Sequence, residues 1–174
     1  MGFTTKKKEV MILKIFQSQT YGKLDIEKIP EKLNKFYVDH KKYGTPIRIT
    51  IGTDSQNHDT TKVVTVIAIT CDGHGGIFFH HTEHLDRINS IKQKLQEETG
   101  KSLETAMVIL DIAEKQYPKM IENTSFAIHV DVGVNGRTKT LIKELVGWVQ
   151  ACGYDCKIKP DSYAASSIAD RISK

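Results

Sequence analysis

The chain has 174 residues, of which 39% are hydrophobic and 26% are charged, and its formal net charge is +4 at pH 7. These proportions are ordinary for a folded domain with one core and exclude a disordered chain or a fibrous protein. No apolar run reaches the roughly 18 to 20 residues of a membrane-spanning helix, and no secretory cleavage site follows the first residues, so we expect a cytoplasmic protein without a membrane partner.

The N-terminal 45 residues are expected to form an arm and a helix that pack on the domain formed by residues 46–174. Residues 1–24 show no dominant periodicity, and no helix or strand is predicted for them. Residues 25–44 predict an amphipathic helix, whose apolar stripe must cover either the core or a partner subunit in a homo-oligomer. The stripe consists of Ile26, Ile29, Leu33, Phe36 and Tyr37.

The remaining sequence predicts alternating strands and helices. Residues 46–54, 62–71 and 77–84 predict three strands joined by short turns, which is typical of an antiparallel meander. Residues 86–117 predict helix with a break at Thr99-Gly100. A fourth strand over 125–133, a helix over about 138–151 with Trp148 packed inward, a short strand near 156–159 and a last helix after Pro160 complete the order. We therefore expect an α/β fold with a five-stranded mixed sheet in the order β-β-β-α-β-α-β-α.

Two aspartates occupy equivalent places in this pattern. Asp54 and Asp131 each end a predicted strand, on the face opposite the bulky aliphatic residues, and a turn follows each. Carboxylates at such positions can present hard oxygen ligands to Mg²⁺ or Mn²⁺. An aspartate after a strand is also ordinary turn chemistry, so each residue alone favours the structural reading. Taken as a pair on neighbouring strands, the two aspartates favour a metal site and a structural role about equally.

Three stretches of the sequence carry a family resemblance. They are Ile51-Gly52-Thr53-Asp54-Ser55-Gln56, His129-Val130-Asp131-Val132-Gly133 and Lys159-Pro160-Asp161-Ser162-Tyr163-Ala164-Ala165, with Ala169-Asp170. With the element order, they resemble the ribonuclease H-like superfamily and, within it, the uncharacterised bacterial YkuK family. The resemblance spans about residues 46–174 and implies a nuclease that holds two divalent ions with four acids.

The resemblance assigns these acids by position. The first-strand acid matches Asp54 and the fourth-strand acid matches Asp131. The acid of the first helix best matches Glu104, although Glu104 could also be read as a solvated carboxylate on the helix surface. Glu97 and Glu98 precede the expected break and match less well. The acid of the last helix matches Asp170, because Asp161 after Pro160 is better explained as a helix N-cap.

Other polar clusters bear on ligand binding. A set of basic residues falls on elements that flank the proposed centre and would suit a phosphate backbone, with a solvated rim as the alternative. These residues are Arg137, Lys139, Lys157, Lys159 and Arg171. The histidines at 80, 81 and 84 alternate between the faces of a strand, so no zinc site is expected there. His129 shares a face with Asp131 and is the histidine expected nearest the acids.

These observations lead to a working hypothesis about function. We expect a nuclease that depends on Mg²⁺ or Mn²⁺, with Asp54, Glu104, Asp131 and Asp170 as metal ligands and catalytic residues, acting on RNA or DNA. The alternatives are a noncatalytic module that binds nucleic acid or protein on the same fold, and a hydrolase of small phosphate compounds. The absence of long basic tracts and aromatic platforms keeps the latter open.

Overall fold

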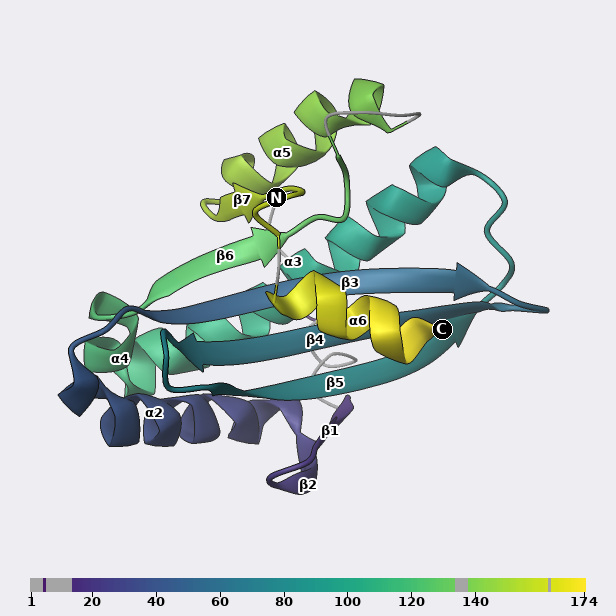
Figure 1. The fold of residues 1–174 in the computed structure, drawn as a ribbon. Coiled ribbons are helices and arrows are strands. Elements are labelled where there is room, and N and C mark those ends of the chain that lie inside the picture. Colours follow the sequence, from purple (N-terminus) through teal and green to yellow (C-terminus); the bar gives the residue numbers. More distant parts are fainter. Residues whose placement is uncertain (1–4, 6–13, 134–137, 163) are drawn as a thin grey trace.

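The computed structural model describes residues 5, 14–133, 138–162 and 164–174. Within these ranges a seven-stranded mixed sheet runs in the order β2-β1-β5-β4-β3-β6-β7 (Figure 1). The strands are β1 (Ile15–Ser18), β2 (Gly22–Asp25), β3 (Ile47–Asn57), β4 (Thr61–Cys71), β5 (Gly76–Leu85), β6 (Ser125–His129) and β7 (Asp155–Lys157). The helices are η1 (Ile26–Lys28), α2 (Ile29–His40), η2 (Lys41–Tyr43), α3 (Ile91–Gln116), α4 (Pro118–Glu122), η3 (Lys139–Leu141), α5 (Ile142–Ala151) and α6 (Ala164–Ser173).

The sheet is larger than the five strands predicted, because residues that received no element form a hairpin. β1 and β2 pair antiparallel, and β1 continues the sheet beside β5 through the pair Gln17 and His80. Strands of four residues contain too few alternations to be recognised by period. The predicted meander β3-β4-β5 is confirmed, and β6 lies parallel to β3.

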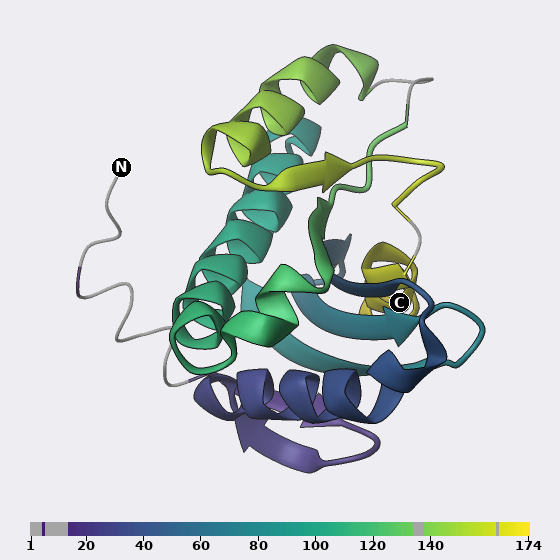
Figure 2. The same cartoon turned by 90° about the vertical axis from the view of Figure 1, so that its left-hand side faces the viewer.

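Helices cover both faces of the sheet. Alternate residues of β3 and β4, such as Ile49, Ile51 and Ile67, join the main core under α2 and α3. The other face carries α6, whose Ala165 and Ala169 are fully buried against residues of β4. Small side chains let this helix approach the strands closely. Figure 2 shows α2, α3 and α5 on one side of the sheet and α6 on the other.

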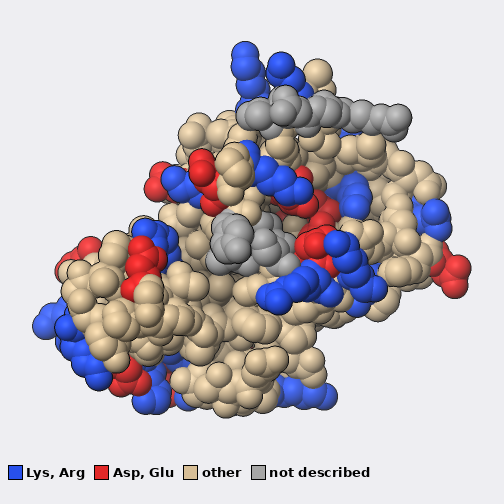
Figure 3. Space-filling view, in the orientation of Figure 1, with Lys and Arg blue, Asp and Glu red and all other residues tan. Residues whose placement is uncertain are grey.

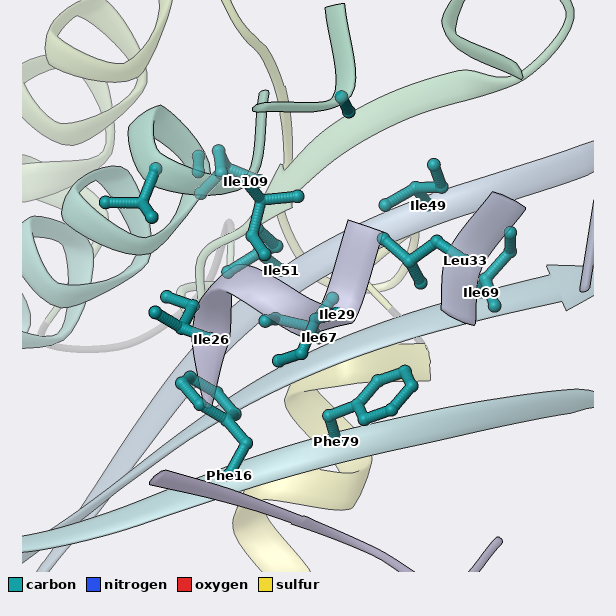
Figure 4. Packing of buried hydrophobic residues seen from close by; sticks show 14 of the residues in the cluster. Phe16, Ile26, Ile29, Leu33, Ile49, Ile51, Ile67, Ile69, Phe79 and Ile109 are labelled. Carbon is teal, nitrogen blue, oxygen red and sulfur yellow. The ribbon is translucent and has the colours of Figure 1, made fainter. Parts of the chain in front are cut away.

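The predicted N-terminal helix is present, and its apolar stripe covers the core of the same chain. Ile26, Ile29 and Leu33 are fully buried in the main cluster, and Figure 4 shows them next to Ile67 and Ile69 of β4. Burying a side chain of this size contributes about 1.5–3 kcal/mol. Burial of the stripe therefore does not require a partner subunit.

The helix predicted over residues 86–117 has no break. α3 runs through Thr99 and Gly100 as one helix of 26 residues. A glycine inside a helix costs only about 1 kcal/mol, which tertiary packing outweighs here. A Cβ at Gly100 would stand 3.4 Å from the Trp148 ring of α5. Trp148 is 41% exposed, so the expectation that it packs inward is wrong: it lies over the glycine with much of its surface in solvent.

Three further boundaries differ from the predictions. β3 continues for three residues beyond Asp54, so this aspartate lies within a strand. β6 ends at His129, two residues before Asp131. α6 begins at Ala164, three residues after Asp161, which is too far for Asp161 to be its N-cap. Cys71, Cys152 and Cys156 are free thiols. None of the described helices is both long and apolar enough to cross a membrane.

Candidate acidic metal centre

Asp54 lies in the interior of β3 and is 5% exposed. Its strand neighbours Thr53 and Ser55 point to the α3 face, where Thr53 Oγ1 lies 2.8 Å from Ser102 Oγ of α3. Strand alternation therefore directs Asp54 to the α6 face. There Ser173 Oγ, at the end of α6, donates a hydrogen bond of 2.5 Å to Asp54 Oδ2. A carboxylate so deep in a sheet needs such a donor.

Asp131 lies two residues beyond the end of β6, the strand that pairs with β3. Gly52 of β3 pairs with His129 of β6, and each aspartate follows two residues later on the same face. The backbone beyond β6 is held to the segment after β7, because Val130 N donates to Lys157 O and Lys159 N donates to Val132 O. The same segment supplies Lys159, whose Nζ pairs with Asp131 Oδ1 at 2.6 Å.

Glu98 reaches the same region from α3 on the opposite face. Ser55 Oγ donates a hydrogen bond of 2.6 Å to Glu98 Oε1. Burial is the largest cause that raises the pKa of Glu98 to about 8, and the negative charges of Asp54 and Asp131 raise it further, against the hydrogen bond of Ser55 and the positive charge of Lys94. Glu98 therefore interacts with both aspartates although it belongs to the other face of the sheet.

Asp170 approaches from the last helix. It lies on α6 one turn before Ser173, and its Oδ2 pairs with Lys174 Nζ at 2.8 Å. Burial raises the pKa of Asp54, and the charges of Asp131 and Asp170 add to this rise, while the Ser173 hydrogen bond and Lys94 oppose it. The charges of Asp131, Asp170 and Glu98 thus all interact with that of Asp54.

Glu104 has a different position from the one expected of the helix acid. It follows Glu98 by six residues, which turns it about 120° away around the helix axis. Glu98 is the α3 glutamate whose charge interacts with Asp54 and Asp131. Glu98 was not recognised from the sequence because the expected break at Thr99-Gly100 separated it from the helix that carries the core stripe. The signal was present in Leu95, Ser102 and Ala106, which continue one buried stripe through Gly100.

The four acids Asp54, Glu98, Asp131 and Asp170 each have a hydrogen-bond or ion-pair partner. Among the described residues, no group of three or more His, Cys, Asp or Glu side chains is arranged to hold a metal ion in this conformation. The donors are nevertheless hard oxygens, which suit Mg²⁺ and Mn²⁺, and two of the partners are lysines that already supply positive charge. An ion that binds here must therefore displace Lys159 from Asp131 and Lys174 from Asp170.

The predicted basic residues fall into different places. A groove of about 960 Å³ lies beside α6 on the face of Asp54, and Lys157 and Arg171 line it with Arg48, which the sequence analysis missed. We call this the α6 groove; its lining includes Arg48, Thr50, Ala127, His129, Lys157 and Arg171. Lys159 pairs with Asp131, Lys139 belongs to η3, and Arg137 lies outside the described residues. Figure 3 shows acidic and basic side chains interspersed on this face.

The histidines also differ in their surroundings. His129 is buried, and burial together with the nearby Lys157 lowers its pKa to about 4, so it is neutral at pH 7. His81 Nδ1 lies 2.8 Å from Ile15 O, which ties β5 to β1. Burial would raise the pKa of Glu83, but Lys14 and Lys101, at 3.2 and 3.1 Å, together lower it. This part of β5 therefore has its own ion pairs.

Comparison with known proteins adds to this geometry. The sequence model of a family described as Ribonuclease H-like matches residues 28–174. The chain is also 36% identical over 171 residues to the uncharacterized protein YkuK of Bacillus subtilis (strain 168), covering 92% of this chain and 97% of that protein. No solved structure gave a significant match.

Proposed function

Because the chain belongs to the ribonuclease H-like family, together with YkuK-like proteins, we propose that it is a metal-dependent nuclease that hydrolyses phosphodiester bonds. The observation that carries this proposal is the electrostatic interaction among Asp54, Glu98, Asp131 and Asp170, which come from four separate segments of the chain. Carboxylates so close repel one another and raise their pKa values, which costs stability unless a cation relieves the repulsion.

The residues that would hold divalent ions follow from this arrangement. Asp54 is the central ligand, because its charge interacts with the other three acids or their partners. Asp131 and Asp170 complete the site on the α6 face, and Glu98 contributes from the α3 side. When bound, two Mg²⁺ or Mn²⁺ ions activate a water molecule for in-line attack on phosphorus and stabilise the leaving oxygen.

The side chains around the acids have roles that this chemistry requires. Ser173 and Ser55 orient Asp54 and Glu98 through their hydrogen bonds. Glu98, with a pKa of about 8, holds a proton at neutral pH and must release it to become a charged ligand. Lys159 is exposed, so after leaving Asp131 it can turn to a phosphate of the bound strand without movement of the backbone.

The test is a cleavage assay on a panel of labelled RNA, DNA, hybrid and branched substrates in Mg²⁺ and in Mn²⁺. Wild type should cleave at least one substrate, and EDTA should abolish cleavage. Asp54→Asn keeps the size and an oxygen acceptor for Ser173 but removes the charge, and it should lower the rate by a factor on the order of 100 or more. Asp39→Asn, on the exposed pair with Lys35 of α2, is the matched control and should retain the rate.

Three results would contradict the proposal. Binding of nucleic acid without cleavage under any metal condition would identify a noncatalytic module. Turnover of small phosphate esters alone would identify a hydrolase of small phosphate compounds. Equal rates for Asp54→Asn and wild type would remove the acidic centre from the reaction.

A further inference from the structure

The α6 groove leads to the acidic centre along one face of the sheet. Thr50 of β3 pairs with Ala127 of β6, and both line the groove. Four residues further along β3, on the same face, lies Asp54, and two residues beyond His129 lies Asp131. On the α6 side the wall includes Arg171, which is adjacent to Asp170. The groove therefore lies on the same face of the sheet as Asp54 and Asp131 and borders the helix that carries Asp170, although none of these acids lines it.

Two polar atoms on the lining of the groove have no hydrogen-bond partner among the described residues. Thr50 Oγ1 and His129 Nδ1 are both buried without a hydrogen bond, and both side chains are 6% exposed. Buried polar atoms in proteins nearly always have a partner, and leaving one unpaired costs about 1–3 kcal/mol. Since both residues line the same groove, a bound ligand can satisfy both atoms at once.

The chemistry of the groove indicates the kind of ligand. The two unpaired atoms are a hydroxyl oxygen and a ring nitrogen. Such atoms form hydrogen bonds with sugar hydroxyls and with base edges. Lys157 and Arg171 also line the groove and can pair with phosphate. Asp155 and Asp161 also line the groove, so it is not a site for bare anions.

The dimensions favour an unpaired strand over a double helix for these contacts. The volume of about 960 Å³ is at the upper end of the range, about 300–1,000 Å³, of pockets that enclose one small ligand. α6 forms one wall and the segment of Asp155 to Asp161 contributes the other. A ligand must insert between them to reach atoms as buried as those of Thr50 and His129. Only unpaired nucleotides can turn a base or sugar inward in this way.

We propose that the α6 groove binds a single nucleic-acid strand and guides it to the acidic centre, so that the substrate class is single-stranded nucleic acid. This inference rests on the proposed nuclease function. It assigns Thr50 and His129 to the binding of a nucleotide unit and places Lys157 and Arg171 on the phosphates that follow it.

The test measures binding in EDTA, where cleavage is absent, by fluorescence anisotropy of a labelled single strand and of the blunt duplex of the same sequence. Wild type should bind the single strand more tightly. Thr50→Val and His129→Phe should each weaken single-strand binding by about three- to tenfold, the loss of one hydrogen bond. Neither should lower the melting temperature, because the atoms removed have no hydrogen-bond partner in the described part of the chain.

Thr99→Val is the matched control. Thr99 Oγ1 is also buried and unpartnered, but it lies on α3, outside the groove. This variant should bind the single strand as wild type does. If Thr50→Val and His129→Phe bind the single strand within twofold of wild type, or if the duplex binds as tightly as the single strand, the inference is wrong. Absence of cleavage with these binding differences intact would instead contradict the proposed nuclease function alone.

Discussion

Ser173, the last residue of α6, donates a hydrogen bond of 2.5 Å to Oδ2 of Asp54, which lies 119 positions earlier in the chain. This contact ties the last helix to the centre of the sheet. It also provides the main favourable hydrogen bond to the most buried aspartate of the site, and it opposes the rise in the pKa of Asp54 that burial causes.

Ser173→Ala should therefore destabilise the protein in a pH-dependent way. The hydrogen bond stabilises the charged form of Asp54, so its loss should cost about 1–3 kcal/mol at neutral pH. The cost should shrink as the pH falls through the pKa of Asp54, because the protonated form depends less on the donor. Urea unfolding at several pH values measures this. An equal loss at all pH values would show that Ser173 acts only through packing of α6.

Glu98→Gln should remove part of the pH dependence of stability. The folded-state pKa of about 8 lies above the ordinary value of 4.5, so between these values the folded protein holds a proton that the unfolded chain has released. The stability that Glu98 contributes is complete below about pH 4.5 and is lost as the pH rises through about 8. Gln stays neutral and can still accept from Ser55.

The variant and wild type should be equally stable near about pH 4, and at about pH 9 the variant should be more stable by about 1–3 kcal/mol. Chemical unfolding at both pH values measures the difference. Glu31→Gln, an exposed change on α2, is the control and should match wild type at both. A Glu98→Gln protein that is less stable than wild type at the higher pH would mean that Glu98 is ionised and stabilised in the fold.

Lys159→Gln should strengthen the binding of Mn²⁺. The ion must displace Lys159 from Asp131, and an exposed ion pair of this kind is worth about 0–1 kcal/mol. Removing it should therefore tighten binding by up to about fivefold, measured by calorimetry on EDTA-treated protein. Lys35→Gln, which breaks the pair with Asp39 on α2, should leave the affinity unchanged. Weaker binding to Lys159→Gln would show that the lysine and the ion do not compete.

Gly100→Ala should stabilise α3 by about 0.5–1 kcal/mol, because alanine loses less conformational entropy in a helix. The new Cβ would stand 3.4 Å from the ring of Trp148, whose exposed side chain can give way. Gly147→Ala on α5 is the control, since a Cβ there meets nothing within 4 Å. Thermal unfolding compares the two. Stabilisation by Gly147→Ala with destabilisation by Gly100→Ala would show that Trp148 is held in place.

The order of the main elements could be predicted from the sequence because each carries enough residues to show its period. β3, β4 and β5 have ten or eleven residues each, and their alternation is long enough to recognise. The same alternation predicted the face of the sheet on which Asp54 lies. β1 and β2 are too short for this, and pairing with β5 is a tertiary contact that no local pattern contains.

The candidate site was predictable to the extent that strand position determines it. Asp54 and Asp131 follow from two strands, and Asp170 from the helix after them. Glu98 was missed because Gly100 suggested a helix end, whereas packing holds α3 straight across it. The α6 groove could not be predicted, because Arg48 and Lys157 belong to strands far apart in the sequence that meet only across β6.

The hairpin of β1 and β2 has a consequence for the behaviour of the protein at high concentration. Without β1, the ten-residue strand β5 would be an open edge, and long open edges pair with other molecules and aggregate. The hairpin covers part of β5, where Gln17 of β1 pairs with His80, and moves that part of the edge outward to β2, which has four residues. The opposite edge is β7, which has three. Loss of residues 15–25 would open more of β5 to pairing with other molecules, so it should cost solubility even if the acidic centre stays intact.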